Sequence, residues 1–140
     1  MKIKVLATAL APDCYEFVGD VVEAFESGHK EVYDLRNFPE GGIFLEAEKL
    51  PSGAQSIRGV KRVGEELIVT LTQRVIAGQY PGRKAHWRES PIIDAEDYDP
   101  EICYVIPTGM AGVDDYEIVQ GVDVAGNTGW TVRKKEMADG

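Results

Sequence analysis

Residue types that most often carry catalysis or bind metals are scarce in this sequence. Its 140 residues include two histidines, His29 and His86, and two cysteines, Cys14 and Cys103. Neither histidine has a partner at the spacing of metal ligands, and the cysteines occupy unrelated positions. We interpret both histidines as solvated surface residues and both cysteines as buried, reduced thiols.

The motifs of common enzyme classes are missing as well. There is no glycine-rich phosphate-binding loop, no dinucleotide-binding fingerprint and no G-x-S-x-G nucleophile elbow. No residue is singled out as a nucleophile, a general acid or a general base. The sequence therefore predicts a protein that is not an enzyme and that needs no cofactor.

The sequence also has few basic residues relative to acidic ones and lacks long apolar runs. The chain has 15 Lys and Arg against 24 Asp and Glu, which gives a net charge of −9. A negative field repels phosphate backbones and disfavours general nucleic-acid binding. No segment approaches the roughly 20 apolar residues of a membrane span, and Lys4 interrupts the one stretch that imitates a signal peptide. We expect a protein that is synthesised in the cytoplasm and binds neither nucleic acid nor membrane.

Strand patterns, by contrast, are abundant. In residues 67–75, Leu67, Val69, Leu71 and Val75 fall on one face, and threonine and arginine fall on the other. This period of two in β-branched residues is typical of a half-buried strand. Residues 57–63 are also β-rich and are separated from it by a turn at 64–66, so we expect a β-hairpin. Further strands are expected at residues 3–9, 102–106, 116–119, 122–124 and 130–133, with a turn at 126–129.

Residues 13–27 admit two interpretations. Asp13 could cap a helix with Glu16 as its capping-box partner, and apolar residues follow at helical spacing. Against a helix, Gly19-Asp20 lies in the middle and the valines prefer strands. We favour strands, with residues 15–17 and 31–33 as the arms of a hairpin.

These patterns together predict a mainly β protein, a small antiparallel sandwich or barrel-like domain with long loops. The alternative is an α+β domain with one N-terminal helix near 13–27. Residues 1–133 are expected to form a single domain, and residues 134–140 a charged flexible tail.

Two long connections separate the expected strands, at residues 37–56 and 78–100, and the first contains a possible short strand at 43–45. Structureless loops beyond about 12–15 residues are uncommon in compact domains and often serve binding. The second connection contains a basic and aromatic run in an otherwise acidic chain. Two interpretations stay open: its side chains form an interface with another protein, or Trp87 packs into the domain's own core while the arginines pair with the acidic stretch that follows. The candidates are Tyr80, Arg83, Lys84, His86, Trp87 and Arg88.

An acidic stretch follows at residues 94–101. Asp94, Asp97 and Asp99 could converge on Ca²⁺, which prefers oxygen ligands. Ala95 and Tyr98 break the register of a calcium-binding loop, and no glycine follows at the required place. We therefore favour a solvated turn and expect no metal.

Four short segments carry a resemblance to a known group of proteins. The segments are 7–12 (ATALAP), 32–35 (VYDL), 66–73 (ELIVTLTQ) and 93–100 (IDAEDYDP). They resemble small proteins encoded in the tail-gene modules of tailed bacteriophages and prophages. The resemblance covers roughly residues 3–106 and leaves the region from Thr108 onward without a counterpart.

The resemblance implies a structural or accessory role in the virion, at the tail, with no catalytic residues to carry over. We expect the protein to pack through its long loops against other phage structural proteins and further copies of this chain in an assembly. One alternative is an assembly factor that is absent from the mature particle. Another is a small glycan- or Ca²⁺-binding β-domain, in which Tyr80, Trp87 and Trp130 could line a sugar platform.

Overall fold

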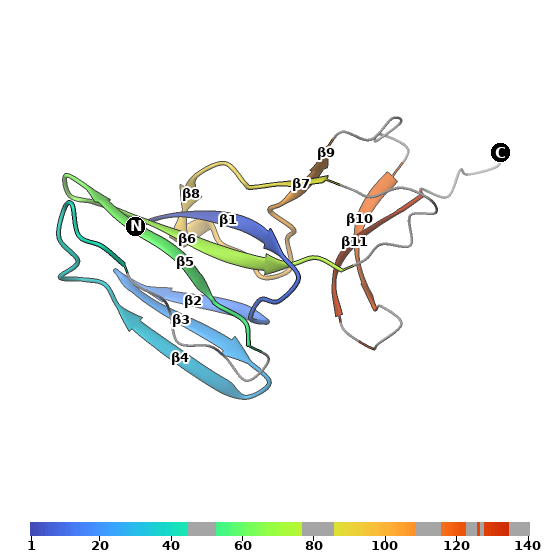
Figure 1. Ribbon diagram of the computed structural model, residues 1–140, viewed down its shortest axis with the longest axis horizontal. Coiled ribbons are helices and arrows are strands. Elements are labelled where there is room, and N and C mark those ends of the chain that lie inside the picture. Colours follow the sequence, from blue (N-terminus) through green and yellow to red (C-terminus); the bar gives the residue numbers. More distant parts are fainter. Residues whose placement is uncertain (45–52, 77–85, 109–115, 123–125, 127, 135–140) are drawn as a thin grey trace.

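The computed structural model describes residues 1–44, 53–76, 86–108, 116–122, 126 and 128–134 (Figure 1). Within these ranges the chain forms strands and one short 3₁₀ turn, and no α-helix. The predicted mainly β fold is therefore confirmed. The elements are β1 (Lys2–Thr8), β2 (Cys14–Val18), β3 (Val21–Glu26), β4 (His29–Asp34), β5 (Ile57–Val63), β6 (Glu66–Arg74), β7 (His86–Arg88), β8 (Ile93–Asp94), η1 (Ala95–Asp97), β9 (Ile106–Thr108), β10 (Tyr116–Val122) and β11 (Thr128–Lys134).

Two open sheets form the body of the molecule. One has the strand order β5-β6-β1-β8, and the other is the meander β2-β3-β4. Figure 1 shows them as two layers, with β2–β4 lying below β5, β6 and β1. The strands pair antiparallel except for β1 and β6, which run parallel with Ile3 opposite Val69. This arrangement is a small sandwich, and the sheets of the described residues do not close into a barrel.

The core lies between the two layers. Its members come from both sheets and from the segments beside them, and they include Ile3, Tyr15, Val22, Ala24, Leu35, Ile57, Leu67, Val69, Leu71 and Ala95. The alternation predicted along 67–75 is confirmed within β6, because Leu67, Val69 and Leu71 are at most 1% exposed. Val75 lies beyond the end of β6 and is half-buried. Thr72 was expected on the solvated face, yet it is buried because it contacts the Tyr15 hydroxyl. Ala9, expected in the first strand, lies beyond its end and is exposed.

Residues 13–27 form a hairpin, so the alternative of an N-terminal helix is wrong. Gly19 and Asp20 form a two-residue loop between the paired residues Val18 and Val21. Gly19 has φ +58°, a conformation that glycine adopts without steric cost and that would interrupt a helix. The strand at 21–26 also lies between residues 15–17 and 31–33, so these two segments are outer strands of a meander rather than arms of one hairpin.

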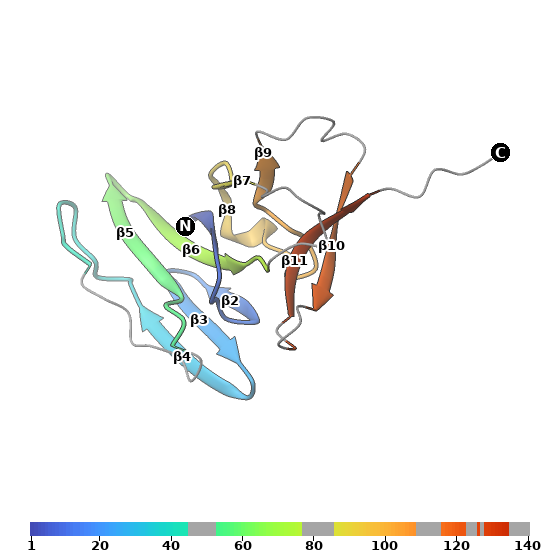
Figure 2. The same ribbon diagram turned by 45° about the vertical axis from the view of Figure 1, so that its right-hand side comes forward.

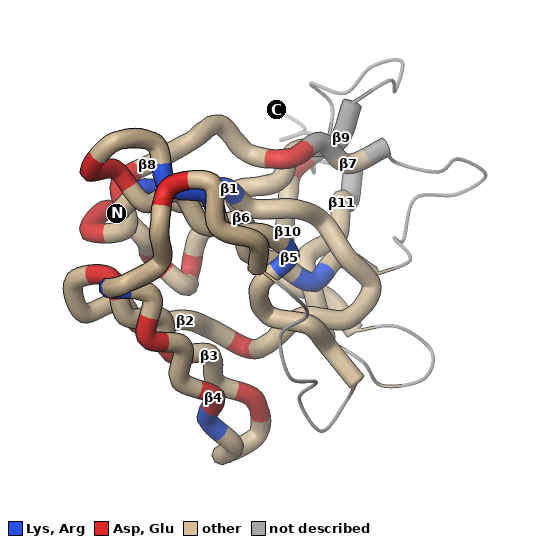
Figure 3. The backbone as a smooth tube through the Cα atoms, turned by 60° about the vertical axis from the view of Figure 1, so that its left-hand side comes forward, with Lys and Arg blue, Asp and Glu red and all other residues tan. Residues whose placement is uncertain are grey.

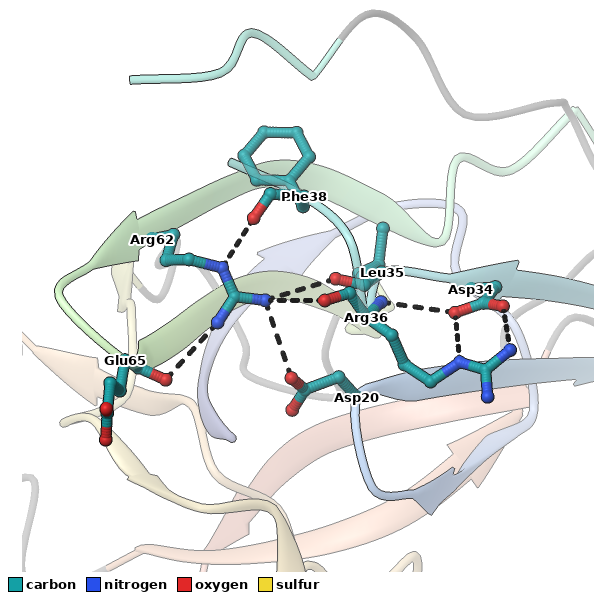
Figure 4. Close-up of polar contacts among 7 residues, drawn as sticks. All are labelled: Asp20, Asp34, Leu35, Arg36, Phe38, Arg62 and Glu65. Carbon is teal, nitrogen blue, oxygen red and sulfur yellow. Dashed lines mark hydrogen bonds and ion pairs between the residues drawn. The ribbon is translucent and has the colours of Figure 1, made fainter. Parts of the chain in front are cut away.

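Arg62 ties the two layers together at one end (Figure 4). From β5, its guanidinium donates to the carbonyl oxygens of Leu35 at 3.3 Å, Arg36 at 3.4 Å and Glu65 at 3.2 Å, and also to that of Phe38. Arg62 also contacts the second sheet, because its Nη2 lies 3.5 Å from the carboxylate of Asp20 in the loop between β2 and β3. Carbonyl groups that follow β4 thus find donors on the opposite layer, which satisfies backbone groups that no strand partner reaches.

The C-terminal strands form two small ladders beside the sandwich (Figure 2). β7 pairs with β9, and β10 pairs with β11, both antiparallel. Strands on both sides of the expected turn are therefore confirmed, but 116–119 and the start of 122–124 belong to one strand, β10, and Thr128 and Gly129 already belong to β11. Residues 123–125 and 127 lie outside the described part of the chain. Lys134 ends β11, and residues 135–140 lie outside the described part of the chain.

Two expected strands are corrected. In the run 102–106, only Ile106 is in a strand; the strand continues through Pro107, whereas residues 102–105 are irregular. Cys103 and Tyr104 are engaged there in local contacts, with Tyr104 N donating to Gln73 Oε1 at 2.9 Å. Ile43 and Phe44 are not in a strand, and Ile43 is 82% exposed. Leu45 lies outside the described residues.

Candidate functional site

The basic and aromatic segment can be placed only in part. Tyr80, Arg83 and Lys84 lie outside the described residues. The backbone of His86–Arg88 forms β7, in register with Ile106–Thr108 of β9. The one described side chain of this segment is that of Trp87, which is half-buried. The interface at this segment, with side chains of His86 and Arg88 included, therefore stays a prediction.

The three aspartates considered for Ca²⁺ make separate local contacts. Asp94 forms an ion pair with Lys2 across the β1–β8 ladder. Asp99 Oδ1 accepts a hydrogen bond from the backbone amide of Glu101 at 2.9 Å, and this bond closes a tight turn across Pro100. Asp97 lies in η1, where its carbonyl oxygen accepts from the Tyr104 hydroxyl at 3.3 Å. No set of three or more metal-ligating side chains converges among the described residues.

Among the histidines and cysteines, the structure describes the side chains of His29, Cys14 and Cys103. His29 is exposed at the start of β4, and its Nε2 lies 2.6 Å from Glu31 Oε1. Both thiols are free, but they are half-buried rather than buried. Burial raises the pKa of Cys103 to about 12, while the thiol donates to Val105 O at 3.1 Å. A thiol with such a raised pKa is a poor nucleophile near neutral pH.

The Tyr15 hydroxyl forms several hydrogen bonds within the core. Its hydroxyl lies 2.9 Å from Ser56 O and 2.8 Å from Thr72 O, and it accepts from Thr72 N at 3.1 Å. Because burial disfavours the phenolate, the pKa of Tyr15 is raised and the group stays protonated. The Tyr15 ring meets Tyr98 edge to face, with ring centroids 5.9 Å apart. These contacts join β2, β6 and the segment after η1.

Arg74, at the end of β6, carries a partly buried positive charge. Its Nη2 lies 3.6 Å from Glu26 Oε1 and also donates to Ala11 O, and its Nη1 donates to Thr128 O at 3.4 Å. Glu26 is only 4% exposed, so the two side chains form an ion pair with little solvent. Arg74 Nε is buried and has no hydrogen-bond partner within the described residues. Arg74 thus connects the sandwich to the first residue of β11.

A cavity of about 360 Å³ lies where the β10–β11 hairpin meets the sandwich. The sandwich contributes residues from β6 and from the segments around Asp13 and Tyr98, and the hairpin contributes the end of β10 and the start of β11. The polar and aromatic groups among its lining residues are Asp13, Gln73, Arg74, Tyr98, Gln120 and Trp130. Its size lies at the lower end of the range for small-molecule pockets.

Glycines bring the hairpin close to the sandwich. A Cβ on Gly129 would lie 2.8 Å from Ile76 Cγ2, and a Cβ on Gly121 would lie 3.5 Å from Ile76 Cδ1. Ile76 N donates to Trp130 O at 3.0 Å, next to an isolated parallel bridge between Val75 and Trp130. A larger residue at Gly129 would therefore press against the segment that follows β6.

Four of the nine exposed large apolar residues in the described part of the chain lie at strand ends. In the C-terminal part, Val122 is 57% exposed on β10 and Ile106 is 51% exposed on β9. In the sandwich, Val18 is 69% exposed and Val63 is 50% exposed. Single exposed apolar residues are ordinary on protein surfaces. Such a residue indicates an interface only where it lies beside an open strand edge, at which another chain can pair.

Charge is distributed unevenly along the chain (Figure 3). Residues 14–34 contain six acidic residues and one lysine, and Figure 3 shows the acidic positions spread along β2, β3 and β4. On β1, Lys2 pairs with Asp94 and Lys4 with Glu89, so the basic residues there are locally neutralised. Residues 116–134 contain two acidic and two basic residues. The C-terminal hairpin is therefore the less charged surface.

Sequence reasoning missed the cavity and the role of Arg74. Trp130 was noted as a sugar-binding candidate, and it does line the cavity, whereas Trp87 is not among the lining residues. One signal could have pointed there: an arginine ends the otherwise apolar and threonine-rich strand β6. The glycines that surround Trp130 were interpreted only as turn residues.

Comparisons with protein-family models, with curated proteins and with solved structures find no match to this chain. The described part of the chain contains no helix that is long and apolar enough to cross a membrane.

Proposed function

We propose that this protein is a non-enzymatic structural or accessory subunit of a larger assembly, and that it packs against other subunits through its C-terminal strands. The resemblance of four segments to small proteins of phage tail-gene modules makes the virion, at its tail, the expected location. The partners are other structural proteins of the particle and further copies of this chain.

The open ladder β10–β11 is the observation that carries this proposal. Beyond their mutual pairing, the only further bridge of these strands among the described residues is that between Val75 and Trp130. A two-stranded hairpin is marginally stable alone in water, and each strand of such a pair has an outer edge of backbone donors and acceptors. A strand added from a neighbouring subunit would supply partners for these groups.

Charge favours the same surface, and exposed apolar side chains are present on it. Val122 and Ile106 lie on the C-terminal strands and are each more than half exposed. Copies of a chain with a net charge of −9 repel each other most strongly through their acidic faces. Contact through the balanced segment 116–134 avoids the acidic strands β2–β4 and removes apolar surface from water.

The test is the oligomeric mass of the purified chain, measured by light scattering after size-exclusion chromatography. We expect the wild type to exceed the mass of one chain and Val122→Asp to shift toward the monomer. Val63→Asp is the matched control, because Val63 is a similarly exposed valine at the far end of the β5–β6 hairpin. A wild type that stays monomeric at every concentration, or an equal loss of mass in both variants, contradicts the proposed surface.

A further inference from the structure

We infer that the cavity between the β10–β11 hairpin and the end of β6 binds a neutral sugar unit in its pyranose form, with Trp130 as the aromatic wall. This binding activity goes beyond the proposed assembly role and does not depend on it. It rests on the size of the cavity, on the mixture of groups that line it and on their balance of charge.

The shape of the cavity limits the ligand to a small molecule. Its volume of about 360 Å³ would hold a single ring with its substituents, and it opens between two elements that are far apart in the sequence. The lining includes the buried residues Val5 and Tyr15 and the exposed polar residues Gln120 and Thr128 of the hairpin. A ligand would therefore meet both apolar and polar groups.

The lining of the cavity contains both hydrogen-bond donors and acceptors. Arg74 supplies donors, Asp13 supplies a carboxylate, and Gln120 supplies an amide that can do both. Asp13 Oδ2 accepts from Ser27 N at 3.0 Å, and this bond holds the carboxylate in place. Each hydroxyl of a sugar donates one hydrogen bond and accepts others, so a polyhydroxylated ring matches such a mixed set.

The aromatic wall suits the other side of the same ligand. Trp130 is half-buried on β11, and Tyr98 also lines the cavity. The face of an aromatic ring is electron-rich and attracts the weakly positive C–H groups of a flat aliphatic surface. A pyranose has such a C–H surface on one face and hydroxyls at its edge. An acyclic polyol has the hydroxyls without the flat face.

The charges at the cavity argue against an anionic ligand. The Arg74 guanidinium is already paired with Glu26, and the Asp13 carboxylate also lines the cavity. An anion would meet that carboxylate and a guanidinium that Glu26 already neutralises, inside a protein of net charge −9. A neutral ligand avoids this repulsion, and a cationic probe tests whether Asp13 selects a cation instead.

The experiment uses the two tryptophans as separate reporters. The chain contains only Trp87 and Trp130, so Trp87→Phe leaves Trp130 as the sole tryptophan, and Trp130→Phe leaves Trp87. Both variants are titrated with the methyl pyranosides of glucose, galactose, mannose and N-acetylglucosamine while tryptophan emission is recorded. Sorbitol, sodium acetate and tetramethylammonium chloride serve as the acyclic, anionic and cationic comparisons. Circular dichroism checks that both variants remain folded.

We expect at least one pyranoside to change the Trp130 emission in a saturable way, with a dissociation constant of about 1 mM. The emission of Trp87 in the matched variant should not respond. If Trp130→Phe alters the fold, chemical-shift changes in the wild-type protein at Gly121 and Gly129 provide the second readout. No saturable change with any pyranoside in either readout overturns the inference. A response of equal size to sorbitol, or a stronger response to acetate or tetramethylammonium, overturns it as well, since each assigns the change to another class of ligand.

Discussion

Replacing Tyr15 by phenylalanine removes one buried hydroxyl and leaves the ring contacts intact. The hydroxyl donates to one of two carbonyl oxygens, Ser56 O at 2.9 Å or Thr72 O at 2.8 Å, and accepts from Thr72 N at 3.1 Å. Two hydrogen bonds are lost at about 1 kcal/mol each, and the buried Thr72 amide is left unpaired, which costs about 1–3 kcal/mol. Since the phenylalanine side chain recovers part of this loss by avoiding burial of a hydroxyl, we expect a net destabilisation of about 2–4 kcal/mol.

The assay is urea unfolding at 25 °C, followed by tryptophan emission and by circular dichroism. Tyr104→Phe is the matched control, because the Tyr104 hydroxyl also makes two hydrogen bonds, with Asp99 N at 2.7 Å and Asp97 O at 3.3 Å, but at exposed positions. It should cost less than about 1 kcal/mol, since water replaces the lost partner. If Tyr15→Phe is no more destabilising than Tyr104→Phe, the hydroxyl does not hold the two layers together as we describe.

Three further outcomes follow from the same structure. Leu71→Ala should destabilise the fold by about 2–4 kcal/mol through a core cavity, while Leu10→Ala at a half-exposed site should cost far less in the same urea assay. Cys103, with its pKa raised to about 12, should react with iodoacetamide at pH 8 much more slowly in the folded protein than in urea, and equal rates would contradict its burial. The Arg36 guanidinium lowers the pKa of Asp34 from 3.8 to about 2, so this pair stabilises the fold above pH 4 and its contribution is lost as the pH falls toward 2. An NMR titration in Arg36→Ala should return the Asp34 pKa toward 3.8; an unchanged value would show that Arg36 is not the cause.

Local patterns in the sequence predicted those parts of the fold that local geometry determines. The hairpin at residues 57–75 was recognisable because alternation and a glycine-containing turn both act over a few residues. Gly19-Asp20 favoured strands over a helix for the same reason. The run at 102–106 misled because apolar composition alone does not distinguish a strand from an irregular segment held by side-chain bonds, such as those of Gln73 to Tyr104 N and to Ile102 O.

Long-range features could not be predicted from these patterns. The parallel pairing of β1 with β6 joins residues 2–8 to residues 68–74, and nothing in either strand specifies the partner. The contacts of Arg62 and the ion pair of Arg74 with Glu26 depend on how the layers meet. The cavity exists only because the C-terminal hairpin reaches the end of β6, so no contiguous motif could have marked it.

Membership of a phage particle is the central proposal, and mass spectrometry of phage particles purified from the strain that carries this gene tests it most directly. The account predicts peptides from this chain at a fixed number of copies per particle, together with the other tail proteins. Particles that contain their tail proteins but lack this chain would contradict a virion role and would leave an assembly factor as the function that fits.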